Sequence, residues 1–108
     1  MINISENEGS FSFTPSPLEA NMNGVTHGGI LAYFCDEVLG RYVTSLGRKG
    51  AAVGVEIHFY RPAPIGDRIT ATVSERKAGK RLGTYLVELK NSNNQLLADA
   101  LFTISFLE

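Results

Sequence analysis

The sequence predicts an α+β domain in which one long amphipathic helix packs against an antiparallel sheet. Apolar residues recur at helical spacing in one segment, apolar and polar residues alternate in five others, and turn-forming residues separate the last three of these. A chain of 108 residues can bury about two-thirds of its unfolded surface in one core. We therefore expect residues 1–108 to form one domain.

The predicted elements begin with a strand over residues 10–14, where apolar and polar residues alternate until a proline ends the run. Residues 19–24 show neither period and are expected to form an irregular loop. From Gly29 the apolar residues repeat every three to four positions as far as Leu46, which predicts the helix. Gly47 follows at the position where a glycine commonly caps a helix C-terminus.

After the helix the period changes to two, which predicts four strands. In the first of them the alternate apolar residues from Val53 to Phe59 are expected to share one face. Gly79 and the polar run 91–94 supply the turns on either side of the third strand. The four strands cover residues 53–59, 69–74, 85–89 and 98–106, and the last three are expected to form a meander.

The composition argues against several classes of protein. Ten Lys and Arg against eleven Asp and Glu give a net charge of -1, so no basic field attracts a nucleic acid. No apolar run reaches the roughly 18 residues of a membrane span, and the first residues lack a signal-peptide pattern. A cytoplasmic protein with neither a nucleic-acid nor a membrane partner is expected. The single cysteine, Cys35, is expected to be a small core residue, and no metal site is expected.

The helix entrance is the segment that indicates chemistry. Gly28 and Gly29 stand where the first backbone N–H groups of a helix lack partners and where the helix dipole is positive. Glycine lets an ester or thioester oxygen approach the backbone there, and Asp36 supplies a carboxylate that can act as a base or a nucleophile. Gly28 and Asp36 are about 12 Å apart along a helix, so one chain cannot bring both to one carbonyl.

Simpler interpretations of these carboxylates stay open. Asp36 shares a helical stripe with small residues, which also fits a solvent-facing acid on a closely packed helix. Gly40 on the same stripe costs about 1 kcal/mol relative to Ala, which favours close approach by another group. Glu37 stands four residues before Arg41, in the order that favours an ion pair, so we expect it to be a surface residue.

A combined motif runs through this region: Asn21-x-x-Gly24-x-x-His27-Gly28-Gly29, then Leu31 and Asp36. It resembles the signature of the hotdog-fold acyl-CoA thioesterases of the PaaI, or phenylacetyl-CoA thioesterase, type. Residues 59–67 resemble the end of that family's second strand and the turn after it. The resemblance implies a sheet wrapped around one central helix and hydrolysis of an acyl-CoA to a carboxylic acid and coenzyme A. Coenzyme A is then part of the substrate, and no separate cofactor is implied.

The resemblance also implies roles for single residues. The amide of Gly28 polarises the thioester carbonyl, and Asp36 comes from the opposite subunit of a dimer, which resolves the separation of the two groups. Asn21 helps to position the thioester, whereas His27 shapes the loop more than it transfers protons. The resemblance implies a homodimer. A dimer of such dimers is expected too, but the choice between dimer and tetramer stays open, because the strand face with Gly54, Glu56 and His58 can meet either solvent or a second dimer.

Further candidates for substrate contact lie at the helix entrance, after the second strand and in a basic cluster at residues 76–81: His27, Gly29, Arg61, Lys80 and Arg81. On charge alone the basic cluster is a solvated hairpin tip. The resemblance implies that the nucleotide phosphates of coenzyme A bind near this region, where Lys and Arg suit them.

Two positions depart from the family pattern. Relatives often carry a Ser or Thr ten residues before the proline that matches Pro62, and some carry a Thr one turn after the acid. Here these positions are Ala52 and Gly40. The missing hydroxyls support a second interpretation, a non-catalytic protein that binds or senses acyl-CoA. A hotdog dehydratase is a third and weaker one, because such sites pair a catalytic histidine with the acid, whereas His27 precedes the glycine pair.

Overall fold

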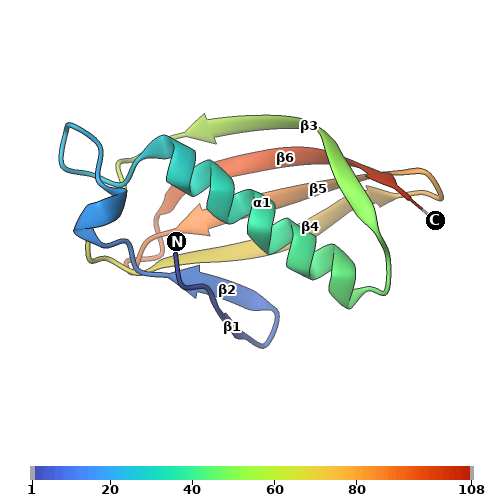
Figure 1. Cartoon of the computed structure of the whole chain (residues 1–108), viewed down its shortest axis with the longest axis horizontal. Helices are drawn as coiled ribbons and strands as arrows, with labels where there is room; N and C mark the ends of the chain where they lie inside the picture. Colours follow the sequence, from blue (N-terminus) through green and yellow to red (C-terminus); the bar gives the residue numbers. More distant parts are fainter. Residues whose placement is uncertain (1, 108) are drawn as a thin grey trace.

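In the computed structural model, which describes residues 2–107, a six-stranded antiparallel sheet carries one long helix on one face (Figure 1). The elements are β1 (Ser5–Asn7), β2 (Ser10–Phe13), the 3-10 helix η1 (Pro17–Glu19), α1 (Gly28–Ser45), β3 (Gly50–Phe59), β4 (Ile69–Ala78), β5 (Leu82–Lys90) and β6 (Leu96–Phe106). The strands lie side by side in the order β1-β2-β4-β5-β6-β3. The predicted α+β class is confirmed.

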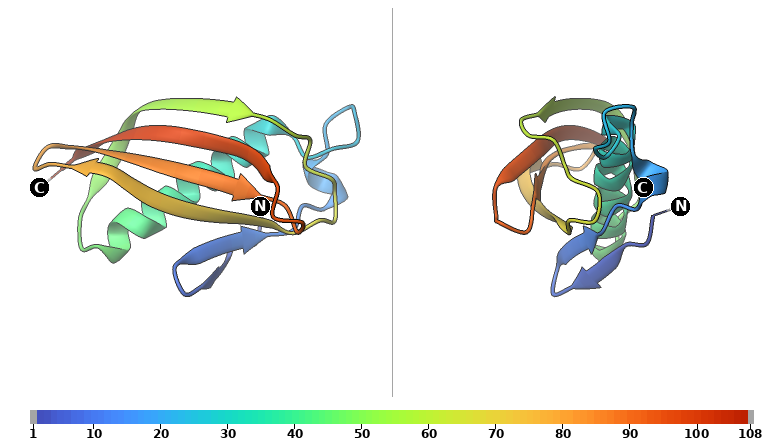
Figure 2. Two further views of the ribbon diagram at one scale, coloured as in Figure 1. Left: turned by 180° about the vertical axis from the view of Figure 1, so that it is seen from behind. Right: turned by 90° about the vertical axis from the view of Figure 1, so that its left-hand side faces the viewer.

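The core lies between α1 and the sheet, which curves around the helix when the molecule is viewed end-on (Figure 2). Helix α1 contributes Phe34, Val38 and Leu39, each at most 1% exposed, and this spacing confirms the helical period. The ring of Phe34 packs edge-on against that of Phe13 on β2, with centroids 4.5 Å apart. No helix in the described part of the chain is both long enough and apolar enough to cross a membrane.

Helix α1 ends at the glycine that the sequence predicts. Gly47 has a φ of 77°, in the left-handed region that favours glycine. Its amide donates to the carbonyl of Thr44 at 2.9 Å, and the amide of Arg48 donates to the carbonyl of Val43 at 3.3 Å. This pair of bonds is a Schellman motif, which satisfies carbonyls of the last turn before the chain reverses into β3.

The predicted meander is confirmed as β4-β5-β6, and the structure adds β1 and η1, which the sequence pattern does not predict. Strand β1 consists of exposed polar residues, so no apolar alternation marks it. It forms because a tight turn at Glu8 and Gly9, both with positive φ, folds it back onto β2, where Ser5 lies opposite Ser12.

Strand β3 lies at an edge of the sheet and pairs with β6. A bulge after Ala52 shifts the register, so that Ala52 opposes buried Ile104 and Val55 opposes buried Phe102. Opposed residues share a face, which places Ala52 and Val55 on the core side. The prediction that Val53 shares the face of Val55 is therefore wrong, because the bulge interrupts the period of two.

The two ends of the sheet carry different segments (Figure 1). The start of α1, the loop after β3 and the β5-β6 turn lie at one end, and the α1-β3 turn and the β4-β5 hairpin lie at the other. Strand β3 runs the length of the molecule between them, so its first and last residues belong to opposite ends.

Candidate functional site

A pocket of about 300 Å³ lies where α1 begins, beside the loop that follows β3. We call it the entrance pocket, and its lining residues are Thr26, Gly28, Leu31, Phe59, Tyr60, Arg61, Pro62 and Ala63. Buried Thr26 joins its two sides, because its amide and its hydroxyl both donate to the carbonyl of Ala63 at 2.8 Å. The loop before the helix and the loop after β3 are thereby held together as one wall.

The first turn of α1 leaves one backbone amide open. His27 is the N-cap residue, and its Nδ1 accepts a hydrogen bond from the amide of Gly29 at 3.0 Å. The carbonyl of His27 accepts from the amides of Ile30 and Leu31 at 2.9 and 3.2 Å. Within residues 2–107 the amide of Gly28 has no hydrogen-bond partner, and Gly28 lines the entrance pocket. An N–H at the positive end of a helix suits an oxygen that gains negative charge during a reaction.

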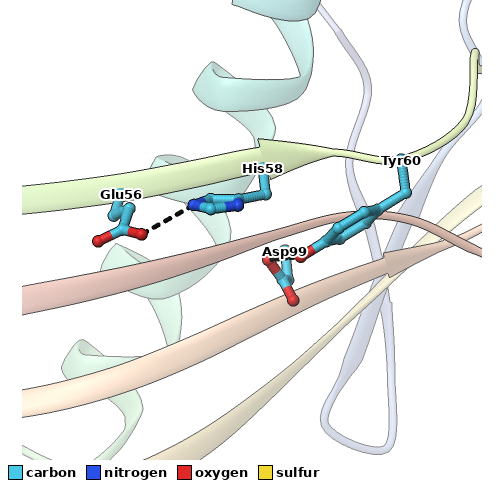
Figure 3. Close-up of polar contacts among 4 residues, drawn as sticks. All are labelled: Glu56, His58, Tyr60 and Asp99. Carbon is cyan, nitrogen blue, oxygen red and sulfur yellow. Dashed lines mark hydrogen bonds and ion pairs between the residues drawn. The ribbon is translucent and has the colours of Figure 1, made fainter.

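A hydrogen bond holds Tyr60 at the edge of this pocket (Figure 3). The Tyr60 hydroxyl donates to Oδ1 of Asp99 on β6 at 3.0 Å, and this bond raises the pKa of Tyr60. On β3, Nε2 of His58 lies 2.8 Å from Oε2 of Glu56, and the rings of His58 and Tyr60 are 6.4 Å apart. These polar side chains lie on the sheet face away from α1, and Tyr60 is the one among the four that lines the pocket.

The acid that the motif singles out lies in a different place. Asp36 is exposed and lines a depression of about 280 Å³ between α1 and the start of β3, which we call the acid depression. Gly40 and Ala52 line it too, so both positions that depart from the family pattern lie beside the acid. Its other lining residues are Glu37, Leu39, Val43, Gly50, Ala51 and Ile104, and the whole set carries no hydroxyl group.

Gly28 and Asp36 do not meet within one chain. They lie on the same straight run of α1, about 12 Å apart by the rise of a helix. The entrance pocket and the acid depression have no lining residue in common. They adjoin opposite ends of β3, since Phe59 lines the first and Gly50 lines the second. The separation predicted from the spacing is confirmed.

Asn21 helps to fold the loop that leads into the helix. Its Oδ1 accepts hydrogen bonds from the amides of Asn23 and Val25 at 2.9 and 3.3 Å, and its own amide donates to the carbonyl of Val25 at 2.8 Å. Asn21 is not among the residues that line the entrance pocket. Its contact with a thioester therefore stays a prediction. Because Oδ1 already accepts two hydrogen bonds, the side-chain NH2 group is the part of Asn21 left to make that contact.

The five candidates for substrate contact fall into two groups. At the end of the sheet where α1 begins, Arg61 lines the entrance pocket and donates to the carbonyl of Leu96 at 3.0 Å. The side chain of His27 and the amide of Gly29 bond to each other there, and neither residue lines the pocket. Lys80 and Arg81 lie in the β4-β5 hairpin, at the other end of the sheet. One chain therefore keeps its candidate substrate contacts at opposite ends, as it does Gly28 and Asp36.

Two residues have the structural roles that the sequence predicts. Glu37 pairs with Arg41 at 3.1 Å on the helix surface. Cys35 is buried in the core at 1% exposure, and loss of solvent raises the pKa of its thiol to about 12. A thiol in that setting stays protonated at neutral pH and is a poor nucleophile.

Thr26 and the pair of Tyr60 and Asp99 are site residues that the sequence does not reveal. Alternation places Asp99 on the face opposite to Ala98 and Ala100, but only the β3-β6 register brings it next to the end of β3. That pairing joins residues about 40 positions apart, and no local pattern encodes it.

Comparison with known proteins gives one consistent result. The family model described as "Thioesterase superfamily" matches residues 23–98. The acyl-coenzyme A thioesterase PaaI of Escherichia coli is 33% identical over 97 residues, which are 88% of this chain and 69% of that protein. A putative esterase of Archaeoglobus fulgidus is 34% identical over 84 residues, 78% of this chain and 54% of that protein. Mouse acyl-coenzyme A thioesterase 13 is 33% identical over 86 residues, 77% and 61% of the two chains. This chain thus spans little more than half of the length of some of its relatives.

Comparison with solved structures points to the same family as comparison with the sequences of relatives. The E. coli PaaI structure superposes with a TM-score of 0.90 at 28% identity, covering 99% of this chain and 80% of that one. A Streptococcus mutans protein bound to acetyl-CoA has a TM-score of 0.89 at 20% identity, with 99% and 89% coverage, and shows the shared fold. The predicted hotdog fold is confirmed, and the chain belongs to the thioesterase superfamily.

Proposed function

We propose that this protein is a homodimeric, cytoplasmic acyl-CoA thioesterase whose active site forms between two subunits. The observation that carries the proposal is that the entrance pocket and the acid depression lie at opposite ends of one exposed edge strand. The entrance pocket, with its open Gly28 amide, adjoins the end of β3, and the acid depression adjoins its start. Relatives that are named acyl-coenzyme A thioesterases support the reaction class.

The edge of β3 supports the dimer. All but one of its ten residues are exposed, and the exposed set includes Val53, Val55 and Phe59 at 63%, 54% and 53%. A long edge strand with apolar side chains is a template for pairing with another strand, and proteins normally cover such edges. Two copies of β3 that pair antiparallel about a two-fold axis cover both edges at once.

Antiparallel pairing also completes the site. The start of each β3 then lies beside the end of the other, so the acid depression of one subunit faces the entrance pocket of its partner. Gly28 of one chain and Asp36 of the other meet at one thioester, and the dimer has two such sites. The β4-β5 hairpin with Lys80 and Arg81 lies at the end of the sheet where β3 starts, beside which the acid depression lies, so it approaches the partner's pocket too.

The chemistry follows from these groups. The thioester carbonyl oxygen accepts a hydrogen bond from the Gly28 amide, which stabilises the negative charge that develops when the carbonyl carbon is attacked. Asp36 either takes a proton from an attacking water or attacks the carbon itself. In the first route the bond from carbon to sulfur breaks, the proton that Asp36 took from water passes to the sulfur, and coenzyme A leaves as the thiol. In the second route the acyl group stays on Asp36 as a mixed anhydride when coenzyme A leaves. Water then hydrolyses the anhydride, which frees Asp36 and supplies the second oxygen of the carboxylic acid and the proton of the thiol.

A second function is favoured by one observation, the absence of a hydroxyl group in the acid depression. A water beside Asp36 has no side-chain hydroxyl to orient it, and a protein without such a group can bind acyl-CoA without cleaving it. The proposal and this alternative predict the same dimer and the same ligand, and they differ in whether thiol is released.

The test is thiol release from a panel of acyl-CoAs that differ in chain length and aromatic character, followed with a colorimetric thiol reagent. We expect release by the wild-type protein and a loss of at least 100-fold in Asp36→Asn, which keeps the size of the side chain. Glu37→Gln is the matched control, because it removes the neighbouring carboxylate, whose partner is Arg41, and we expect it to keep most of the activity. Tight binding of the panel without release by the wild-type protein identifies the binding or sensing protein instead.

A further inference from the structure

Six of the ten Lys and Arg residues gather at one end of the molecule, in the α1-β3 turn and the β4-β5 hairpin: Arg48, Lys49, Arg76, Lys77, Lys80 and Arg81. We call this group the basic end. The whole chain has a net charge of -1, so these cations are concentrated and not merely abundant. The basic end lies beside the start of β3, at the end of the sheet that carries the acid depression.

Arg48 joins the two segments of the basic end. Its two terminal nitrogens donate to the carbonyls of Gly79 and Lys80 at 3.1 and 3.0 Å. Its guanidinium carbon lies 3.4 Å from the centre of the Phe106 ring on β6, which is stacking distance. One side chain from the α1-β3 turn therefore holds the main chain of the hairpin tip and the last strand.

Arg48 adds a positive charge to a hairpin that carries four others, at residues 76, 77, 80 and 81. Its two hydrogen bonds hold the carbonyls of Gly79 and Lys80, which belong to the segment that carries two of these cations.

Two backbone hydrogen bonds also fix the hairpin tip. The amide of Gly79 donates to the carbonyl of Leu82 at 2.9 Å, and the amide of Phe106 on β6 donates to the carbonyl of Arg81 at 2.8 Å. The strands are interrupted just before the tip by a register shift between Glu75 and Lys77. The fork of Arg48 binds two successive carbonyls, so it restricts the peptide that immediately precedes the side chains of Lys80 and Arg81.

We infer that Arg48 is a positioning residue, which fixes the β4-β5 hairpin so that its cations meet the phosphate groups of coenzyme A in a preformed arrangement. This rests on the proposed function, in which acyl-CoA is the substrate and the hairpin with Lys80 and Arg81 approaches the partner's entrance pocket. The role is distinct from phosphate binding by Arg48 itself, because it depends on the planar fork and the ring contact and not on the charge alone.

The test compares Arg48→Lys, which keeps the charge and loses the fork, with Arg48→Ala, which loses both. Each is assayed on an acyl-CoA and on the matching S-acyl pantetheine, which lacks the phosphates. We expect both variants to raise KM for the acyl-CoA roughly tenfold, with kcat within about twofold and S-acyl pantetheine kinetics unchanged. Arg41→Lys, a change of another arginine on α1 that pairs with Glu37, is the matched control and should leave KM unchanged.

Amide hydrogen exchange gives a readout that does not need turnover. We expect faster exchange of the Gly79 amide in Arg48→Lys. In Lys80→Ala we expect unchanged exchange there, because the Lys80 side chain is proposed to contact the phosphates and not to hold the turn.

The inference is overturned if Arg48→Lys keeps the wild-type KM for the acyl-CoA. It is overturned too if kcat/KM falls equally for the acyl-CoA and for S-acyl pantetheine. Calorimetry with coenzyme A separates it from the proposed function. Coenzyme A binding that Arg48→Lys leaves intact contradicts the positioning role alone, whereas a wild-type protein that neither binds coenzyme A nor cleaves its thioesters contradicts the proposed function.

Discussion

The ring of Phe59 stands over Gly28, with its Cζ 3.5 Å from the point that a Cβ on Gly28 would occupy. An alanine at this position would touch the ring at ordinary van der Waals distance without overlap, and Gly28 does not have a positive φ. A small side chain is therefore compatible with the fold here. The open amide of Gly28, and not the absence of a side chain, is what the proposed chemistry needs.

A proline at position 28 tests the need for the backbone N–H separately from the need for a correctly folded helix start. Gly28 is the first residue of α1, where proline is well tolerated, and His27 before it has φ -60° and ψ 133°, the extended conformation that proline requires of its predecessor. Gly28→Pro removes the N–H and no existing hydrogen bond. We expect Gly28→Pro to fold with wild-type stability within about 1 kcal/mol and to lose activity by a factor of about 10² to 10³.

Gly28→Ala is the control for that experiment, because it keeps the amide and adds only a methyl group. It should retain measurable thioester cleavage and unfold at the same urea concentration or a slightly higher one. Equal activity in Gly28→Pro and the wild-type protein would exclude the Gly28 amide as the oxyanion donor.

The cap of α1 gives a prediction about stability. Nδ1 of His27 accepts the Gly29 amide, so His27→Ala leaves a second amide of the first turn without a partner. We expect the free energy of unfolding to fall by about 1 kcal/mol, measured by urea denaturation at one fixed protein concentration. His27→Asn restores a capping oxygen and should recover most of the loss. A catalytic role for the imidazole would show as lost turnover in His27→Asn despite its recovered stability.

The sequence alone predicts much of the fold for a physical reason. Helix α1 and the meander β4-β5-β6 bury one face each, so their apolar residues repeat with a clear period, and Gly79 and Asn91 mark the turns. Strand β1 buries nothing, and the bulge in β3 breaks the period, so neither is visible in the pattern.

The site is less predictable than the fold, because it is assembled by long-range pairing. The motif identifies Gly28 and Asp36, and the spacing correctly keeps them apart. That Ala52 lies beside Asp36 follows only from the packing of β3 against α1, which brings together residues from two elements. The pairing of Tyr60 with Asp99 depends in the same way on the β3-β6 register.

The neighbourhood of Asp36 predicts a gain of activity. Ala52 lines the acid depression and is exposed, so a serine there fits without displacing core residues. Ala52→Ser supplies a hydroxyl that can orient a water beside the acid. We expect kcat on the best acyl-CoA to rise several-fold, roughly 1 kcal/mol in barrier height, with KM unchanged. An unchanged kcat in Ala52→Ser would show that the missing hydroxyl does not limit the reaction.

Cys35 predicts how stability depends on pH. Burial raises the pKa of its thiol from 9.0 to about 12, so between these values the unfolded chain releases a proton that the folded chain keeps. Stability from this group is therefore fully present below about pH 9 and falls as the pH rises toward 12. Urea unfolding at pH 7.5, 9 and 10.5 should show a smaller loss in Cys35→Ala than in the wild-type protein. Burial also raises the pKa of Tyr85, so part of the loss of stability at high pH remains in both proteins. If the free energy of unfolding falls with pH equally in the two proteins, the assignment to Cys35 is wrong.

Mixed dimers give the most direct test of a site shared between subunits. Gly28→Pro and Asp36→Asn each inactivate both sites of a homodimer, because every site takes Gly28 from one chain and Asp36 from the other. A heterodimer of the two variants has one site with both groups intact and one with neither. If the subunits of two inactive variants are mixed in equal amounts, unfolded and refolded together, half of the dimers are heterodimers, so activity should return to about a quarter of the wild-type value. Refolding each variant alone controls for recovery through refolding itself. A site confined to one chain predicts no recovery, because each chain in the mixture still lacks one of the two groups.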